Sequence, residues 1–491
     1  MLEIVNQAER VRREVAPRTE QAHKAAFGQF MTPASVARFM ACLFPESTLQ
    51  TCRLLDAGAG VGALSCAFLH RWAEGRGFDF GEVEVTAYEI DATLREHLAQ
   101  HLAGYRNVTP RIIAGDYIEL ATAEGLQGPG YTHAILNPPY KKINSQSEHR
   151  QALRRVGIET VNLYSAFVAL AVAQAAPGGQ IVAIIPRSFC NGPYYRPFRD
   201  FILERAAIRH MHLFDSRNKA FKDDDVLQEN IIIRLERGGA QGPVTVSTST
   251  DDAFSDLSTH EHPFARIVFP DDPERFIHVP TSREKNPLEL SAAVRSSLAD
   301  IGVKVSTGPV VDFRLKEHLR AMPERSTVPL LYPGHFNNGK GVTWPIAGAK
   351  KPNAIVRDTE SEKWLYPSGF YCVVRRFSSK EEKRRIVASV VDPATFGDAP
   401  VLGFENHLNV FHENKRGLPQ ALAHGLALFL NTTAVDEYFR RFNGHTQVNA
   451  TDLKTMKYPS RAALIQLGEW AMQQAALSQA QIDAKLGTLT A

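Results

Sequence analysis

Short apolar runs alternate with amphipathic stretches between residues 53 and 235. The runs are rich in Val, Ile and Leu, which is typical of buried strands, and the stretches between them carry apolar residues at helical spacing. This alternation predicts a doubly wound α/β domain with a mostly parallel sheet. The expected strands are 53–55, 84–88, 111–114, 133–136, 180–185, 211–214 and 230–235, and the expected helices are 34–44, 63–73, 92–103 and 163–176.

The pattern changes after residue 235. Gly238 and Gly239, followed by a stretch rich in Ser, Thr and Asp at 246–259, predict a linker. We therefore expect a first domain over 1–245 and a second, mixed domain over 246–491. Residues 461–486 carry Leu, Ala, Trp and Ile at helical spacing, which predicts a C-terminal helix packed on that second domain.

Composition narrows the class of protein. The 491 residues are 44% hydrophobic and 22% charged, so a folded globular protein is expected and not a disordered or collagen-like chain. The net charge of +3 does not by itself indicate a polyanion partner. The five cysteines form no C-x-x-C pair, which argues against a disulfide framework or a zinc site. No signal peptide or membrane span is recognised, so a cytoplasmic location is expected.

A glycine-rich turn follows the first expected strand, in the sequence Asp56-Ala57-Gly58-Ala59-Gly60-Val61-Gly62. Small residues between a strand and a helix let a ligand approach the backbone. Gly58, Gly60 and Ala63 also satisfy the fingerprint of a dinucleotide turn, so a nicotinamide or flavin dinucleotide remains an alternative. Asp56 and Glu89 favour S-adenosylmethionine, because two carboxylates suit a cation and a ribose diol better than a pyrophosphate.

The sequence Asn137-Pro138-Pro139-Tyr140 follows the apolar run at 133–136. The Asn137 side-chain oxygen and the Pro138 carbonyl oxygen can accept hydrogen bonds from both N–H groups of an amine conjugated to an aromatic ring. Two such acceptors localise the nitrogen lone pair and make the amine more nucleophilic. Tyr140 adds a face on which a planar base can stack. The segment predicts methylation of a planar amine without a metal, unless it is only a sharp turn with an aromatic lid.

Together these segments resemble the gamma-class DNA adenine methyltransferases, of which the TaqI enzyme is the familiar structural type. The resemblance covers roughly residues 20 to 240 and implies a Rossmann-like class I methyltransferase fold that binds S-adenosylmethionine. The segments that carry it occur in the family's order: 27–33, 56–60, 88–91, 115–117 and 137–140.

The resemblance also implies roles for single residues. Thr32 and the turn that includes Asp56, Gly58 and Gly60 would contact the methionine part of S-adenosylmethionine, Glu89 its ribose hydroxyls, and Asp116 its adenine amino group. Asn137, Pro138 and Tyr140 would handle the target base, with Asn137 also beside the cofactor. Phe221 would be a second stacking aromatic, although the sequence Lys222-Asp223-Asp224-Asp225 departs from the family pattern.

Polar and aromatic clusters in the second half are candidates for reading DNA, because Asn, Gln and Arg recognise base edges and Lys and Arg hold phosphates. Each cluster alone is also typical of a turn or a solvated surface. The segment from Gly444 to Leu453 resembles the modification methyltransferases of the PstI and BsuBI restriction systems. The clusters are 331–340, 375–380, 406–412 and 442–453, with Lys380, Lys383, Arg384 and Arg385 as a candidate phosphate patch.

The expected function is site-specific methylation of a flipped adenine in duplex DNA, as the modification enzyme of a type II restriction-modification system. The expected partners are double-stranded DNA and a separately encoded restriction endonuclease, and the chain is expected to act as a monomer or weak dimer away from membranes. The alternatives are another planar amine, namely cytosine, an RNA base or a protein glutamine, or a non-catalytic subunit that binds the cofactor and DNA.

Overall fold

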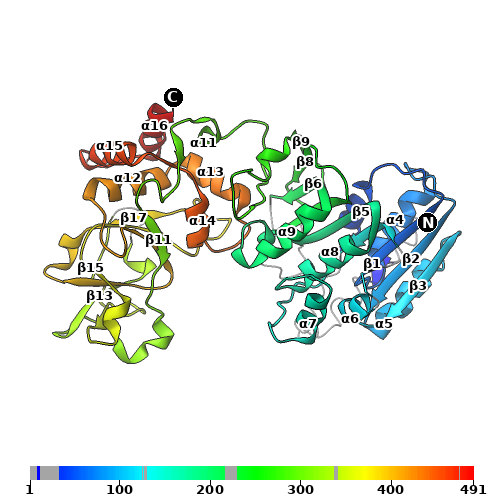
Figure 1. Ribbon diagram of the computed structural model, residues 1–491, viewed down its shortest axis with the longest axis horizontal. Helices are drawn as coiled ribbons and strands as arrows, with labels where there is room; N and C mark the ends of the chain where they lie inside the picture. Colours follow the sequence, from blue (N-terminus) through cyan, green and yellow to red (C-terminus); the bar gives the residue numbers. More distant parts are fainter. Residues whose placement is uncertain are drawn as a thin grey trace. The chain divides into compact units, whose positions relative to one another are not determined.

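A computed structural model describes residues 8–11, 32–123, 125–126, 130–215, 229–336, 341–474 and 476–490. The chain divides into two compact units, Met1–Arg283 and Glu284–Ala491, called unit 1 and unit 2 below. Figure 1 shows the helices and strands of each unit. Each unit is described by itself.

Unit 1 is built on a nine-stranded sheet with the order β3-β2-β1-β4-β5-β7-β6-β8-β9. Strands β1 to β5 are parallel, and β7 runs antiparallel to both β5 and β6. The expected strands are all present and the doubly wound fold is confirmed. The strands are β1 (Thr51–Ala57), β2 (Glu82–Glu89), β3 (Val108–Ala114), β4 (Tyr131–Leu136), β5 (Ala175–Pro186), β6 (Ala206–Phe214), β7 (Asn230–Arg237), β8 (Val244–Ser249) and β9 (Ser258–His262).

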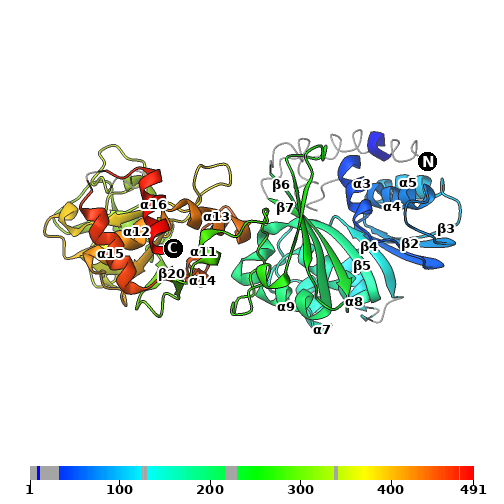
Figure 2. The ribbon, with the colours of Figure 1, turned by 90° about the horizontal axis from the view of Figure 1, so that it is seen from above.

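Helices cover both faces of this sheet, as Figure 2 shows. Neighbouring strand residues point to opposite faces, so Leu54 packs with helices α3 to α5 and Leu55 packs with α6 to α9. The sheet core is therefore apolar on both sides, as expected for a parallel sheet. The helices are α3 (Ala34–Cys42), α4 (Ala63–Ala73), α5 (Ala92–Leu102), α6 (Tyr117–Ala123), α7 (Glu148–Arg155), α8 (Leu163–Gln174) and α9 (Arg196–Arg205).

The expected domain boundary after residue 245 is wrong, because it falls inside β8. That strand pairs with β6, and β9 extends the sheet to His262. The Ser and Thr residues that suggested a linker are partly buried: the Ser247 hydroxyl lies 2.7 and 2.8 Å from ring nitrogens of His210 and His212. This hydroxyl is buried in a strand and bonded to imidazole rings. The sequence alone does not distinguish it from the exposed hydroxyls of a linker.

Unit 2 is mixed, as expected, and contains antiparallel pairs and one parallel pair, β13 with β18. Its four-stranded sheet has the order β11-β19-β16-β17 and its five-stranded sheet the order β12-β14-β13-β18-β15. The strands of the first sheet are β11 (Lys304–Thr307), β16 (Tyr371–Arg375), β17 (Ala388–Val391) and β19 (Leu408–His412). Those of the second are β12 (Leu319–Arg320), β13 (Thr327–Leu331), β14 (Ala354–Val356), β15 (Leu365–Pro367) and β18 (Val401–Phe404).

The described part of unit 2 also contains a two-stranded sheet, six α-helices and several short 3-10 helices. The sheet pairs β10 with β20, and the helices begin with α11, which follows the unit boundary. The strands and α-helices are β10 (Val294–Ser296), β20 (Tyr458–Pro459), α11 (Pro287–Leu290), α12 (Gln420–Leu430), α13 (Thr433–Phe442), α14 (Ala450–Thr455), α15 (Arg461–Met472) and α16 (Gln479–Thr490).

The expected single C-terminal helix is two helices, α15 and α16. Ser478 begins the second one: its amide and hydroxyl both donate to Gln481 Oε1, at 2.9 and 2.8 Å. A Ser followed three residues later by Gln is a helix-capping sequence, which starts a new helix even though the apolar spacing continues across it. The helix boundary is therefore set by the capping hydrogen bonds of Ser478 and not by the spacing of apolar residues.

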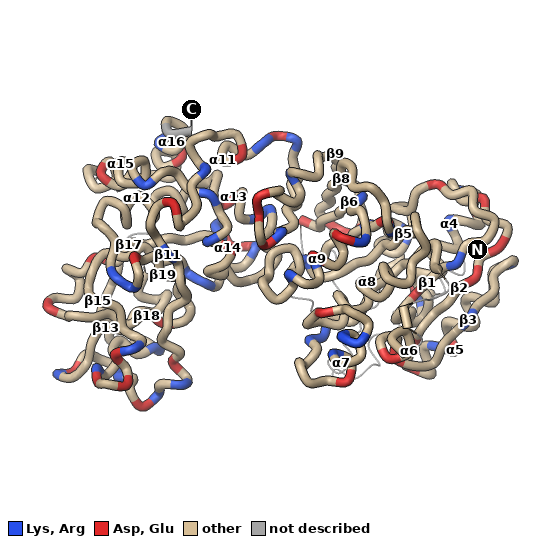
Figure 3. Tube along the Cα trace, in the orientation of Figure 1, with Lys and Arg blue, Asp and Glu red and all other residues tan. Residues whose placement is uncertain are grey.

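Charged residues of both signs are interspersed along the chain in both units (Figure 3). None of the helices in the described residues is long and apolar enough to cross a membrane.

Candidate active site

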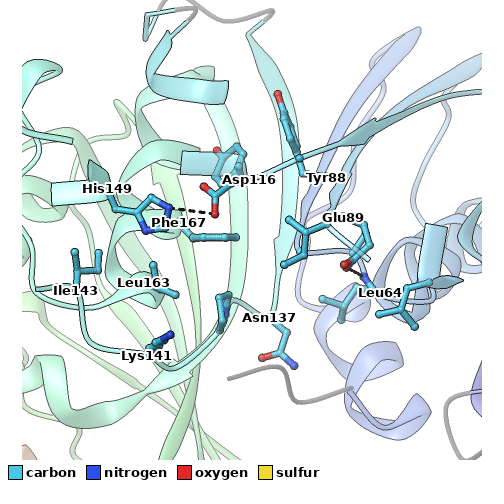
Figure 4. Close-up of a pocket in the computed structure, with 18 of the residues that line it drawn as sticks. Leu64, Tyr88, Glu89, Asp116, Asn137, Lys141, Ile143, His149, Leu163 and Phe167 are labelled. Atoms are coloured by element: carbon cyan, nitrogen blue, oxygen red, sulfur yellow. Dashed lines mark hydrogen bonds and ion pairs between the residues drawn. The ribbon is translucent and has the colours of Figure 1, made fainter. Parts of the chain in front are cut away.

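A cavity of about 360 Å³ opens at the carboxyl ends of β1 to β4 in unit 1. This is the edge at which open α/β sheets bind their ligands, and the volume is that of a small-molecule site. In Figure 4, Leu64 and Glu89 lie on one side of it, and His149 and Phe167 on the other. The predicted site residues that line it are Thr32, Gly58, Gly60, Glu89, Asp116 and Asn137.

The glycine turn after β1 brings backbone to the cavity wall. Gly58, Gly60 and Gly62 all have positive φ, at 76°, 58° and 86°, a conformation that disfavours residues with a Cβ. A Cβ on Gly62 would lie 2.7 Å from a Leu98 methyl group, whereas one on Gly60 would meet nothing within 4 Å. The turn is held by the amides of Gly58 and Ala59, which donate to the Tyr88 carbonyl. The space in front of Gly60 is therefore open to a ligand.

Glu89 ends β2 and is 2% exposed. Its carboxylate accepts hydrogen bonds from the amide of Gly60 at 2.8 Å and from the amide of Asp91 at 2.9 Å. Burial raises the pKa of Glu89, and the two amide hydrogen bonds offset part of that rise. These bonds fix the carboxylate at the cavity wall, where it can accept from a hydroxyl pair.

Asp56 lies behind the glycine turn and does not line the cavity. It is fully buried, and its Oδ2 accepts from the amide and the hydroxyl of Ser65 at 3.2 and 2.6 Å. Burial raises its pKa to about 7 despite these bonds, and the charge of Glu89 adds to the rise. In the described part of the chain its Oδ1 has no hydrogen-bond partner. Asp56 thus joins the end of β1 to the start of α4.

Asp116 follows β3 and contacts His149 of α7 at the cavity wall. His149 Nε2 lies 3.3 Å from Asp116 Oδ2, and the other carboxylate oxygen accepts from the Glu119 amide at 3.1 Å. Burial alone would raise the pKa of Asp116, but the hydrogen bonds from His149 and the amides outweigh it, so that pKa lies below its usual value. The hydrogen bond to Asp116 in turn raises the pKa of His149. With Glu119, the pair is also close enough to share a metal ion.

The Asp116–His149 pair predicts a pH-dependent stability. When folding raises the pKa of a histidine, its protonated form stabilises the folded state. This stabilisation is fully present below the pKa of the histidine in the unfolded chain, about 6.5, and is lost as the pH rises through its pKa in the folded chain. Replacement of His149 by Gln should therefore lower the thermal midpoint at pH 5.5 by about 1–3 °C, because a partly exposed pair contributes at most about 1 kcal/mol. At pH 8.5 the two melting curves should nearly coincide. A difference independent of pH would contradict the prediction.

Asn137 is oriented at the cavity by two neighbours. Its Nδ2 donates to the Thr32 hydroxyl at 2.9 Å, and its Oδ1 accepts from the Tyr140 hydroxyl at 3.3 Å. The Tyr140 ring meets the Tyr164 ring edge to face, with centroids 6.3 Å apart. Pro138 and Tyr140 do not line the cavity themselves, but their chain neighbours Asn137 and Pro139 do. The arrangement presents an amide oxygen, fixed from both sides, to the ligand space.

Several cavity residues were not predicted. Lys141 and Lys142 line the cavity and directly follow the Asn-Pro-Pro-Tyr sequence. Their position next to that sequence could have predicted them. Phe167 lies in a helix that is apolar on all sides, so nothing in the pattern distinguishes it from core, and His149 lies in a charged helix. Phe221 and residues 27–31, which carried part of the resemblance, lie outside the described residues.

In unit 2, the candidate phosphate patch is wrong for Arg385, which is buried, and the half-buried Arg384 is already bonded within the unit. Arg385 is 2% exposed and donates to the Ser378 hydroxyl and to Asn443 Oδ1, at 3.1 and 2.7 Å. Arg384 donates to the Thr432 carbonyl at 2.7 Å. Both guanidinium groups thus join segments of unit 2 to one another, a use of arginine that the sequence does not distinguish from phosphate binding.

The whole chain is similar to characterised proteins. It is 52% identical to the type II methyltransferase M.BsuBI of Bacillus subtilis, over 100% of this chain and 98% of that protein. It is 43% identical to the type II methyltransferase M.PstI of Providencia stuartii, over 92% of this chain and 91% of that protein. A family model described as Eco57I restriction-modification methylase matches residues 107–221.

Among solved structures, the fold is similar to that of a nuclease-deletion mutant of the Type ISP restriction-modification enzyme LlaGI in complex with a DNA substrate mimic. The TM-score is 0.51 at 11% identity, over 94% of this chain and 56% of that chain. The similarity in fold thus extends over both units.

Proposed function

The chain belongs to the type II DNA methyltransferases of restriction-modification systems, and from this premise we propose that it methylates the exocyclic amino group of adenine in one short duplex sequence. The observation that carries the proposal is Asn137, followed by two prolines and Tyr140, fixed at the mouth of the cavity beside Thr32. A DNA methyltransferase of this family uses S-adenosylmethionine, which supplies the methyl group on a sulfonium.

The cavity fits S-adenosylmethionine. Glu89, held by the Gly60 amide, suits the ribose hydroxyls, and the open space at Gly60 admits the ligand next to backbone. Asp116 supplies a carboxylate for the adenine amino group, with the apolar ring of Phe167 beside it for the adenine face. Behind the turn, Oδ1 of the buried Asp56 has no hydrogen-bond partner among the described residues, so it can still accept a hydrogen bond. We assign Thr32, Gly58 and the Asp56 turn to the methionine end.

For the target base, we assign Asn137 Oδ1 and the Pro138 carbonyl as the acceptors of the two amino N–H groups. The Tyr140 hydroxyl donates to that Oδ1 at 3.3 Å, and the second lone pair of the amide oxygen is left for an N–H of the base amine. The Tyr140 ring would then stack on the base, with Phe221 as the second aromatic. Flipping the base out of the duplex costs a few kcal/mol, which stacking and these hydrogen bonds offset. Positioning of the amine is the main contribution to rate.

The remaining assignments follow from the two units. We propose that unit 1 is catalytic and that unit 2 recognises the target sequence, with the chain acting on cytoplasmic DNA as a monomer or weak dimer. The counterpart would be a separately encoded restriction endonuclease, which the methylation protects against. The amino group of cytosine is the competing target, because Asn137 and Pro138 present the same two acceptors to any planar amine.

Modification mapping of plasmid DNA tests this function. The chain is expressed in a host without DNA methylation, and the plasmid is sequenced by a method that identifies the methylated base. The expected result is N6-methyladenine confined to one short palindromic sequence. N4-methylcytosine at such a sequence would overturn the adenine assignment but not the DNA methyltransferase, and unmodified DNA from a folded chain would overturn both the target and the substrate.

A further inference from the structure

Three segments of unit 2, remote in sequence, meet at one surface. They are the residues after β16, the turn between β18 and β19, and the loop between α13 and α14. The Arg376 amide donates to the His407 carbonyl at 2.9 Å, the Val448 amide to the Arg376 carbonyl at 2.7 Å, and the Ser378 amide to the Thr446 carbonyl at 3.0 Å. We call Arg376, Phe377, His407 and Gln447 the Phe377 surface.

A buried carboxylate orients His407 on this surface. Glu405 is 0% exposed, and its two oxygens lie 2.9 Å from the His407 amide nitrogen and 2.5 Å from its ring Nδ1. The His407 side chain itself is 42% exposed. Burying a carboxylate is costly unless its partners are well placed, so this pair fixes one orientation of a solvent-facing ring. With Nδ1 directed to Glu405, the ring presents Nε2 outward.

Phe377 covers the next position of the surface. It is 39% exposed, although it is a large apolar side chain. Its ring lies on that of His407, with centroids 4.9 Å apart and an interplanar angle of 37°, and the Arg376 guanidinium lies 5.9 Å from its centre. The neighbours hold the ring in place without covering it, so its free face is available to an apolar group of a partner.

Gln447 is oriented from the same side. Its Oε1 accepts from Arg376 Nη2 at 3.4 Å, and Arg376 Nη1 donates to the Asn406 carbonyl at 3.1 Å. The loop that carries Gln447 is fixed from below, because the buried Asn409 donates to the Val448 carbonyl at 2.7 Å and Arg385 holds Asn443. The Gln447 amide hydrogens are thereby presented from a rigid backbone, which base recognition requires.

We propose that the Phe377 surface reads base edges of the target sequence in the major groove of duplex DNA. This rests on the proposed function and names the residues that give it specificity. Glutamine and histidine exchange hydrogen bonds with purine edges, and an exposed phenylalanine contacts a thymine methyl group. Lys383 belongs to the same segment as Phe377 and is exposed, so its ammonium group is available to a phosphate of the DNA backbone.

The test uses Phe377→Ala, His407→Ala and Gln447→Ala in the full chain. The matched control is His318→Ala, which removes another histidine of unit 2 that faces a carboxylate, Asp358, at 3.3 Å. Steady-state methylation is measured on duplex oligonucleotides with the mapped sequence and with each single base-pair change, alongside melting curves and S-adenosylmethionine affinity by calorimetry. His407→Ala removes the ring partner of one oxygen of the buried Glu405 and can lower stability for that reason. If that variant melts early, the test depends on Phe377→Ala and Gln447→Ala.

The expected result is a KM for DNA raised about 10- to 100-fold in the three surface variants, with cofactor affinity unchanged and His318→Ala like the wild type. Gln447→Ala should also lose about tenfold of its discrimination at a single base pair. Unchanged KM and discrimination in folded variants would overturn the inference while leaving adenine methylation standing. Methylated cytosine, with the same losses in the variants, would overturn the adenine assignment and leave the surface in place.

Discussion

Replacing Asn137 by alanine is expected to lower kcat for methyl transfer by about 10²- to 10³-fold, the effect of removing one fixed hydrogen-bond group from a reacting centre. The residue lines the cavity at the carboxyl end of β4, where Thr32 fixes its amide. Alanine removes the acceptor for the target amine but leaves Glu89 and Asp116 in place. The affinity for S-adenosylmethionine should therefore change by less than about tenfold, since a neutral hydrogen bond contributes about 0.5–1.5 kcal/mol.

Single-turnover methylation and calorimetry separate these two effects. Asn137→Asp is the control, because aspartate keeps an acceptor oxygen of the same shape and the Thr32 hydroxyl can donate to it. We expect this variant to retain more activity than Asn137→Ala. Normal turnover by the alanine variant would contradict the acceptor role, and so would an aspartate variant no more active than alanine with the cofactor still bound.

The sheet of unit 1 was predictable because its strands are short, apolar and separated by amphipathic helices. The same reasoning failed at β8, where Ser247 and Ser249 are buried and paired with the ring nitrogens of His212. In the sequence, a serine whose hydroxyl is bonded to a buried partner cannot be distinguished from a serine exposed to solvent. The unit boundary was placed too early for this reason, and the break between α15 and α16 depends on a cap that periodicity does not record.

The predicted site residues that meet in the cavity do so because each follows a parallel strand, and parallel strands end at one edge. Thr32 precedes α3 and joins them by its bond to Asn137. Asp56 also belongs to a strand end, but its carboxylate points to Ser65 and not to the cavity, because its position on β1 faces the start of α4. His149 comes from a helix that pattern alone places at the surface, so only the fold shows its contact with Asp116.

A second large effect is expected in unit 2, where α12 and α15 cross with no room for a side chain between them. A Cβ on Gly468 would lie 1.7 Å from the Ala421 carbonyl oxygen, and one on Gly425 would lie 1.8 Å from the Leu464 carbonyl oxygen. These obstacles are backbone atoms, which cannot move away without separating the helices. Leu422 of α12 and Leu464 of α15 are both buried.

Gly468→Ala is therefore expected to destabilise unit 2 by about 3 kcal/mol or more, the upper part of the range for overpacked cores. The thermal midpoint should fall by about 6–12 °C. Gly487→Ala in α16 is the matched control: that glycine is exposed, a Cβ there meets nothing within 4 Å, and alanine favours a helix by about 0.5–1 kcal/mol. Scanning calorimetry compares the two variants. Because the clash lies wholly within unit 2, S-adenosylmethionine binding should survive in Gly468→Ala, and equal melting of both variants would show that the helices can part at little cost.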